Sequence, residues 1–305
     1  MNESATTLAG ELSLPLMRRF REALQRRGVR GRGQPGEGPV WSREWEEGSD
    51  PEVVLSLGYE RVFGRSFLAR GEYRAVEVGP LRDTFRQSGL ADPCGRVTAF
   101  AGTPFVLLVD HRRLGPLPVP RRWEDLLEKD YAGEIVTPGG ELGISSVVLL
   151  HYASRHGLEA MRRFASQVRG CAHGSRVARS AREDAVPAAL AIVPWIYAQC
   201  VRGVDVEVVW PEEGAIFSPM WMAAREDASQ EALELANFFA GPGFGEEAGA
   251  FLCPWASREV SDILPEGARL AWCGWDFLDS VDLEAYSAHL RLEARRARHE
   301  VRGHR

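Results

Sequence analysis

The sequence of 305 residues has almost no lysine. Lys129 is the only one, and every other basic side chain is arginine. A Walker A loop needs a lysine directly after a glycine-rich turn, and pyridoxal enzymes need a lysine for their Schiff base. Lys129 lies between Glu128 and Asp130, which is neither context. The scarcity of lysine therefore excludes P-loop nucleotide hydrolysis and pyridoxal chemistry.

The five cysteines of the chain do not have the spacing of a metal site or of a redox motif. No two of them form a CxxC pair, and no cysteines and histidines have the spacing of zinc ligands. The hydrolase signatures GxSxG and HExxH are missing as well. We therefore expect no metal, no cofactor and no catalytic residues.

Long apolar runs and a strong charge of one sign are both lacking. Without an apolar window of about 18 residues, no transmembrane helix is predicted. The net charge of −6, from 37 basic and 43 acidic side chains, does not attract nucleic acid. Charges alternate too densely over roughly the first 30 residues for a signal peptide, which predicts a cytoplasmic chain.

Apolar runs and helical spacings alternate along the sequence. The apolar runs predict strands at Val53–Leu55, Phe105–Val109, Ala188–Val193, Val204–Trp210 and Ile216–Ala223. Helical spacing predicts helices at 14–27, 149–156, 158–168, 229–240 and 283–298, with Ser229 as an N-cap. This alternation predicts an α/β fold with mostly parallel sheets flanked by helices.

One motif carries a family resemblance. Pro120–Leu127 reads Pro-Arg-Arg-Trp-Glu-Asp-Leu-Leu and is followed by Tyr131, Gly133 and Ile135. It resembles the second-lobe motif of the type 2 periplasmic binding proteins of extracellular solute-binding family 1, which include the ferric-ion binders. Two later segments, Val208–Gly214 and Glu231–Gly245, are similar to this family's return to the first lobe and the helices after it.

The resemblance implies a two-lobed fold and a periplasmic location. Lobe 1 would comprise residues 1–101 and 212–305, and lobe 2 residues 102–211, joined near Thr103 and Trp210. The adjacent tyrosine pair that holds iron in the ferric binders has no counterpart, because Trp195-Ile196-Tyr197 contains a single tyrosine. Ferric iron is therefore not the expected ligand.

Such folds bind ligands between the lobes, at loops after strands and at helix N-termini. In lobe 2 the candidates are a glycine-rich turn with two hydroxyls and a pair of aromatic rings: Gly140, Ser145, Ser146, Trp195 and Tyr197. In lobe 1 they are the turn after the first strand and one hinge residue: Ser56, Gly58, Tyr59 and Thr103. Ordinary turns and core aromatics are the alternative interpretation of each candidate.

The leading hypothesis is a monomeric solute-binding protein of an ABC-type uptake system. It would close by hinge motion on a small molecule or an ion chelate and hand this ligand to an ABC permease. Two alternatives stay open: a cytoplasmic ligand sensor or regulator on the same fold, and an enzyme built on it. No nucleic-acid partner, membrane insertion or catalysis is expected.

Overall fold

The computed structural model describes residues 8–10, 14–27, 51–59, 63, 72–140, 143–176, 188–201, 203–246 and 253–302. The chain divides into two compact units, the first of Met1–Thr103 with Ser218–Glu266 and the second of Pro104–Phe217 with Gly267–Arg305. The chain therefore changes units after Thr103, after Phe217 and after Glu266.

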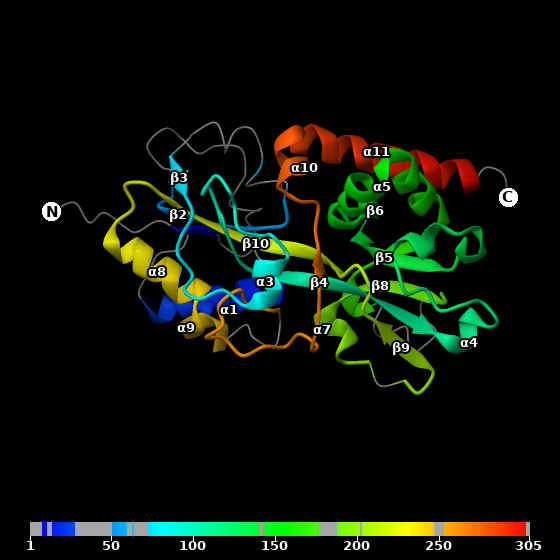
Figure 1. Ribbon diagram of the computed structural model, residues 1–305, viewed down its shortest axis with the longest axis horizontal. Coiled ribbons are helices and arrows are strands. Elements are labelled where there is room, and N and C mark those ends of the chain that lie inside the picture. Colours follow the sequence, from blue (N-terminus) through cyan, green and yellow to red (C-terminus); the bar gives the residue numbers. More distant parts are fainter. Residues whose placement is uncertain are drawn as a thin grey trace. The chain divides into compact units, whose positions relative to one another are not determined.

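The first unit contains a sheet with helices on it (Figure 1). Its elements are β1 (Leu8–Gly10), α1 (Leu14–Arg26), β2 (Val53–Leu57), β3 (Tyr73–Arg74), α3 (Asp83–Gln87), the first part of β4 (Thr98–Asp110), the last part of β10 (Ala215–Arg225), α8 (Gln230–Ala240) and α9 (Pro242–Phe244). β2 pairs with β1 in parallel and with β10 in antiparallel register.

The core of the first unit lies between this sheet and three helices. Phe20 of α1 packs against Phe239 of α8, with ring centroids 4.3 Å apart, and against Phe244 of α9. The predicted N-cap is confirmed, because the Ser229 hydroxyl accepts a hydrogen bond of 3.2 Å from the Ala232 N–H. These contacts bury the apolar side of β2 and of the end of β10.

The second unit also combines strands and helices. Its elements are the rest of β4, α4 (His111–Leu114), the 3₁₀ helices η1 (Glu124–Leu127) and η2 (Lys129–Tyr131), β5 (Ile135–Gly140), β6 (Gly143–Ile144), α5 (Ser146–Gln167), β7 (Val168–Ala172), β8 (Leu190–Pro194), α7 (Trp195–Ala198), β9 (Val206–Val209), the start of β10, β11 (Leu270–Ala271), α10 (Trp275–Ser280) and α11 (Leu283–Arg302). No described helix is long and apolar enough to span a membrane.

The predicted strands and helices are confirmed, with one difference in the helices. The predicted helices 149–156 and 158–168 form the single element α5, which is interrupted at Gly157. Gly157 has φ 85° and ψ 170°, a conformation that glycine adopts without steric cost. The sequence pattern therefore located the break inside α5 correctly.

The sheets are mixed, whereas the sequence favoured mostly parallel strands. β5 pairs in parallel with β7 and β8, and β10 pairs in parallel with β11. The antiparallel pairs come mainly from β4 and β10, which run from one unit into the other and pair with β8, β9, β2 and β3. Whether two strands pair in parallel or antiparallel depends on how the chain connects them. Apolar periodicity predicts the strands but not these connections.

The tryptophan of the Pro120–Leu127 motif is a structural anchor. Trp123 is fully buried, and its indole N–H donates to the Gly214 carbonyl at 2.8 Å. Its backbone N–H donates to Glu213 Oε1 at 2.7 Å, and the Tyr152 hydroxyl donates to its carbonyl at 2.9 Å. The motif therefore ties α5 to the chain just before β10.

The C-terminal helix α11 lies along α5 in the second unit (Figure 1). Arg162 of α5 forms an ion pair with Glu293 of α11, and β11 pairs with the start of β10. The division made from sequence put residues 212–305 in the first lobe, whereas 212–217 and 267–305 belong to the second unit here. The buried face of α11 packs against α5, and these two helices are far apart in the sequence.

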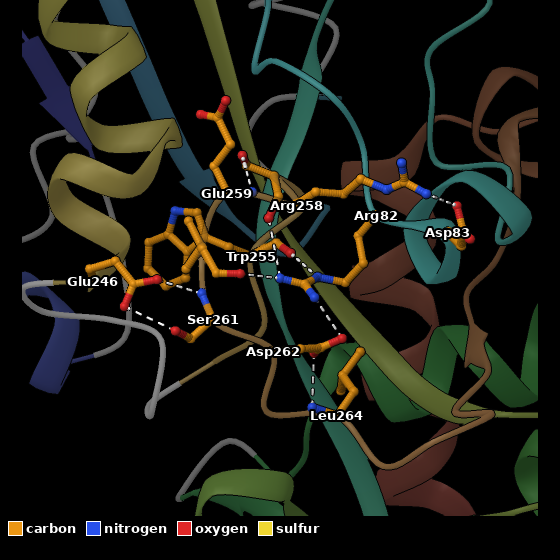
Figure 2. Close-up of polar contacts among 11 residues, drawn as sticks. Arg82, Asp83, Glu246, Trp255, Arg258, Glu259, Ser261, Asp262 and Leu264 are labelled. Carbon is orange, nitrogen blue, oxygen red and sulfur yellow. Dashed lines mark hydrogen bonds and ion pairs between the residues drawn. The ribbon is translucent and has the colours of Figure 1, made fainter.

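In the first unit, Arg82 fastens the segment that leads toward Glu266 (Figure 2). Its guanidinium donates to the carbonyls of Trp255, Ser257 and Val260 at 3.1, 3.2 and 2.5 Å and pairs with Asp262 at 2.6 Å. Only 12% of the Arg82 side chain is exposed. One side chain thus contacts four residues of the irregular segment 255–262.

Candidate functional site

Three parallel strands of the second unit end at one edge of the sheet. β5 lies between β7 and β8, with Pro138 opposite Ala172 and Val136 opposite Ala191. α7 begins directly after β8, and α5 begins after the short hairpin of β5 and β6. In open α/β sheets, this carboxyl edge is where ligands bind.

The N-terminus of α5 lies at this edge. The Ser145 N–H donates to the Pro138 carbonyl at 2.9 Å, while the Ser145 side chain makes no capping hydrogen bond. The Ser146 hydroxyl accepts a hydrogen bond of 2.9 Å from Arg291 of α11. The two predicted hydroxyls therefore differ, because an arginine already contacts that of Ser146.

The hairpin before α5 requires glycine at one position. A Cβ atom at Gly139 would lie 2.0 Å from the Gly143 carbonyl oxygen and 3.1 Å from the Cys171 Cβ. The predicted site residue Gly140 pairs with Gly143 in the same hairpin. Backbone groups therefore approach one another closely at this turn, and the steric need for glycine falls on Gly139.

Tyr197 forms a small polar group with residues that follow β7. Its ring centroid is 5.8 Å from that of His173, and a Cβ atom at Gly174 would lie 2.8 Å from Tyr197 Cδ2. His173 Nδ1 and Ser175 Oγ are 2.8 Å apart. Burial raises the pKa of the Tyr197 hydroxyl, so it is a neutral donor at physiological pH. Sequence reasoning missed His173 and Ser175, although both directly follow a strand.

Trp195, the second predicted aromatic residue, is half-buried at the start of α7. Its ring centroid is 5.5 Å from that of Trp210, with the rings nearly perpendicular. It also packs against the apolar cluster that includes Val106 and Val193. Trp195 therefore fits the alternative interpretation, in which the residue is a core aromatic. Tyr197 fits that interpretation less well.

The candidates of the first unit are more deeply buried. Ser56 is fully buried on β2 opposite Trp221, and its hydroxyl makes no hydrogen bond to the residues that the structure describes. Gly58 has φ 74° and donates from its N–H to the Pro219 carbonyl at 2.8 Å. Tyr59 is 3% exposed, with its ring 6.5 Å from that of Trp221. Thr103 on β4 is half-buried.

The first unit also contains a cavity of about 460 Å³ that the sequence did not signal. Apolar side chains that include Val76, Phe85 and Leu90 line it, together with Asp92. Burial alone would raise the pKa of Asp92, but hydrogen bonds from the Arg96 side chain and from nearby backbone N–H groups lower it. The Asp92 carboxylate thus accepts hydrogen bonds from its own loop, at Cys94, Arg96 and Val97.

No metal-binding cluster is found in the part of the chain that the structure describes. There, no three His, Cys, Asp or Glu side chains are placed to hold a metal ion.

A family model described as bacterial extracellular solute-binding protein matches residues 49–281. No curated protein matches the sequence. The match includes the Pro120–Leu127 motif and both segments that resemble the family. It ends just before α11, which begins at Leu283.

Solved structures of similar fold cover nearly the whole chain. The ferric binding protein of Bordetella has a TM-score of 0.66 at 13% identity, over 96% of this chain and 98% of that one. A Trichodesmium protein in complex with iron and citrate has a TM-score of 0.63 at 12% identity, over 96% and 99%. The periplasmic binding protein AfuA of Actinobacillus pleuropneumoniae, with fructose-6-phosphate bound, has 0.58 at 14% identity, over 98% of each. The predicted two-lobed α/β fold class is thereby confirmed.

Proposed function

We propose that this chain, which belongs to the family of bacterial extracellular solute-binding proteins, binds a small solute for an ABC-type importer. In this role it binds and releases the solute without chemical change and passes it to a permease. The family is one of binding proteins, which supports this role over that of an enzyme.

The observation that carries the proposal is the carboxyl edge of β7, β5 and β8. It gathers the uncapped N-terminus of α5 at Ser145, the hairpin at Gly140 and the Tyr197 ring beside His173. Backbone N–H groups at a helix N-terminus favour polar or anionic groups, and a half-buried ring adds apolar contact. We place the solute against these residues of the second unit.

Hinge closure is part of the proposal. Each crossing between the units is a single strand or segment, after Thr103, Phe217 and Glu266, and a few torsion angles there can absorb a rotation. Solute contacts on both units would favour the closed form, because a ligand shifts an equilibrium only by its difference in affinity for the two states. We propose Thr103, which is half-buried, as the contribution of the first unit, whereas Ser56, Gly58 and Tyr59 are buried and shape the turn after β2.

Binding is tested by a solute screen followed by titration calorimetry. We expect at least one small solute to stabilise the protein against heat. We expect Ser145→Ala to weaken its binding roughly 2- to 10-fold, because one neutral hydrogen bond is lost. Tyr197→Ala should weaken it at least as much. Ser166→Ala, at the other end of α5, is the matched control, since its hydroxyl donates to the Arg163 carbonyl.

Two further measurements separate the parts of this proposal. Small-angle scattering with the solute should show a monomer with a smaller radius of gyration. An unchanged radius would contradict closure, whereas full affinity in both Ser145→Ala and Tyr197→Ala would contradict the site. Fractionation of source cells distinguishes the extracellular location typical of the family from the cytoplasmic location predicted from the first residues.

A further inference from the structure

The cavity of about 460 Å³ in the first unit is large for a void in a protein interior. Protein interiors hold few voids larger than a water molecule, whereas pockets for small ligands span about 300–1,000 Å³. The described residues that line this cavity all belong to one stretch of the first unit, and they are Ala75–Gly79, Leu81, Phe85, Leu90–Asp92 and Val97–Ala99. The cavity therefore shares no residue with the proposed solute site.

Buried apolar side chains form the floor of the cavity, and exposed residues form its rim. Phe85, Leu90 and Val97 are 1%, 2% and 1% exposed. Glu77 and Ala91, which also line the cavity, are exposed. An apolar group that displaces water from apolar walls gains free energy. The floor therefore favours an apolar ligand that enters from the rim.

Polar contacts hold the walls of the cavity in place. The Thr98 hydroxyl donates to the Val76 carbonyl at 2.6 Å, and the Ala75 N–H donates to the Gly95 carbonyl at 2.8 Å. At the other end of the wall, Arg82 is fastened to the segment 255–262 (Figure 2). Walls that are already ordered lose little conformational freedom when a ligand binds, which reduces the cost of association.

The charged groups among the described lining residues are two carboxylates. That of Asp92 accepts hydrogen bonds from the Arg96 side chain and from backbone N–H groups of its own loop, so its charge is compensated. The exposed Glu77 makes no ion pair or side-chain hydrogen bond within the described ranges. A carboxylate without such a partner attracts a cation and repels an anion. The rim therefore favours a positively charged group.

We propose that this cavity is a second binding site, and that its ligand is a small apolar molecule with one cationic group, such as an alkylamine. The apolar part lies against Phe85, Leu90 and Val97, and the ammonium group reaches Glu77. This inference goes beyond the proposed function, because the ligand is not the transported solute. One unit supplies every contact, so this ligand does not favour closure of the two units.

Titrations with hexylamine, hexanol and hexanoate, followed in amide NMR spectra, test the inference. The three probes share one alkyl chain and differ in the charge of the head group. We expect hexylamine to bind most tightly, hexanol less tightly and hexanoate least. The largest chemical shift changes should fall on the amides of residues 75–79 and 97–99.

Variants separate the charged part of the site from the apolar part. Glu77→Gln should weaken hexylamine binding roughly 2- to 5-fold, as for an exposed ion pair, and leave hexanol binding unchanged. Glu72→Gln is the matched control, because Glu72 is exposed in the same segment but is not among the described lining residues. Ala99→Leu should weaken binding of both probes about 10-fold or more, because the larger side chain fills the cavity. Ala75→Leu covers the case in which Ala99→Leu does not fold.

Several results would overturn the inference. One is hexylamine that changes no amide shift at residues 75–79 or 97–99 of the wild-type protein. Another is hexanoate that binds as tightly as hexylamine, or full hexylamine affinity in a folded leucine variant. Tyr197→Ala should leave hexylamine binding unchanged, although it weakens binding of the solute. Loss of hexylamine binding in Tyr197→Ala would place the amine in the solute site and overturn the second site.

Discussion

The two units hold their candidate residues in different surroundings. In the first unit Ser56 and Tyr59 are buried between strands and aromatic rings. In the second unit Ser145 and Tyr197 are partly exposed at the ends of parallel strands. The same kind of sequence signal, small and aromatic residues after an apolar run, therefore led to two structural roles.

The difference follows from strand direction. β2 pairs with β10 in antiparallel register up to Leu57, and the Gly58 N–H then bonds to the Pro219 carbonyl. The partner strand therefore covers the residues after β2. Parallel strands end together at one edge and leave the following loops uncovered, as after β5, β7 and β8.

The largest expected effect tests this comparison with two tyrosines. Tyr59→Ala should lower the free energy of unfolding by about 3–5 kcal/mol, because it empties a buried aromatic site. Tyr197→Ala should lower it by only about 1 kcal/mol, as for a partly exposed side chain. Urea unfolding followed by circular dichroism measures both. Equal losses would show that the two residues do not differ in role.

Arg82 shows whether the first unit depends on buried polar contacts as well. Arg82→Met should cost about 2–4 kcal/mol of unfolding free energy, since it leaves three carbonyls and Asp262 without this donor. Arg86→Met is the control. The pair of Arg86 with Asp83 is exposed, so its loss should cost at most about 1 kcal/mol. A small loss for Arg82→Met in the same unfolding measurements would mean that water replaces these contacts.

Acid should destabilise the second unit through one buried histidine, His151, which lies in its residue range 104–217. Burial, with the nearby charges of Arg155 and His156, lowers the pKa of His151 from 6.5 to about 3. Between these values only the unfolded chain takes up the proton, so stability falls as pH falls, by about 1.4 kcal/mol per pH unit.

His151→Leu should remove this contribution. Urea unfolding at several pH values between 7.5 and 4.5 should then give a shallower slope for the variant, by about the same 1.4 kcal/mol per unit below the unfolded pKa. The variant should be at least as stable at pH 7.5, because neither ring nitrogen of His151 has a hydrogen-bond partner among the described residues. An unchanged slope would mean that the folded protein also protonates this histidine.

The smallest expected effect concerns two glycines. Gly58→Ala should cost about 1–2 kcal/mol, because φ at this position is 74° and a Cβ atom is strained there. Gly170→Ala on β7 is the control, since a Cβ atom there meets no atom within 4 Å. Thermal unfolding of both variants measures the difference. Equal midpoints would show that the turn after β2 adjusts without cost.

Much of the fold was predictable because it rests on local patterns. Apolar runs located the strands that contain Val54 and Leu107. The N-cap was located because Ser229 precedes a segment with helical spacing. The spacing of the residues around Trp123 indicated the family, and in the structure the Trp123 indole is buried and donates to the Gly214 carbonyl. Such features depend on neighbours in sequence or on one specific contact.

The candidate site was predictable only in part. Its loops were found because glycine, serine and aromatic residues after strands are visible in the sequence. The contact of Arg291 with Ser146 was not, since 145 positions separate the two residues. The group of Tyr197 with His173 was missed for the same reason, because β7 and β8 come together only through β5.

The sequence by itself determined the class of fold, the family and most strands and helices, because periodicity and motif spacing are local properties. Only the tertiary structure decided which candidates are buried, that α11 packs with the second unit, and that Arg291 of α11 contacts Ser146 at the start of α5. Burial and electrostatic environment are sums over neighbours from distant parts of the chain, and these neighbours are defined only once strand order and helix packing are known.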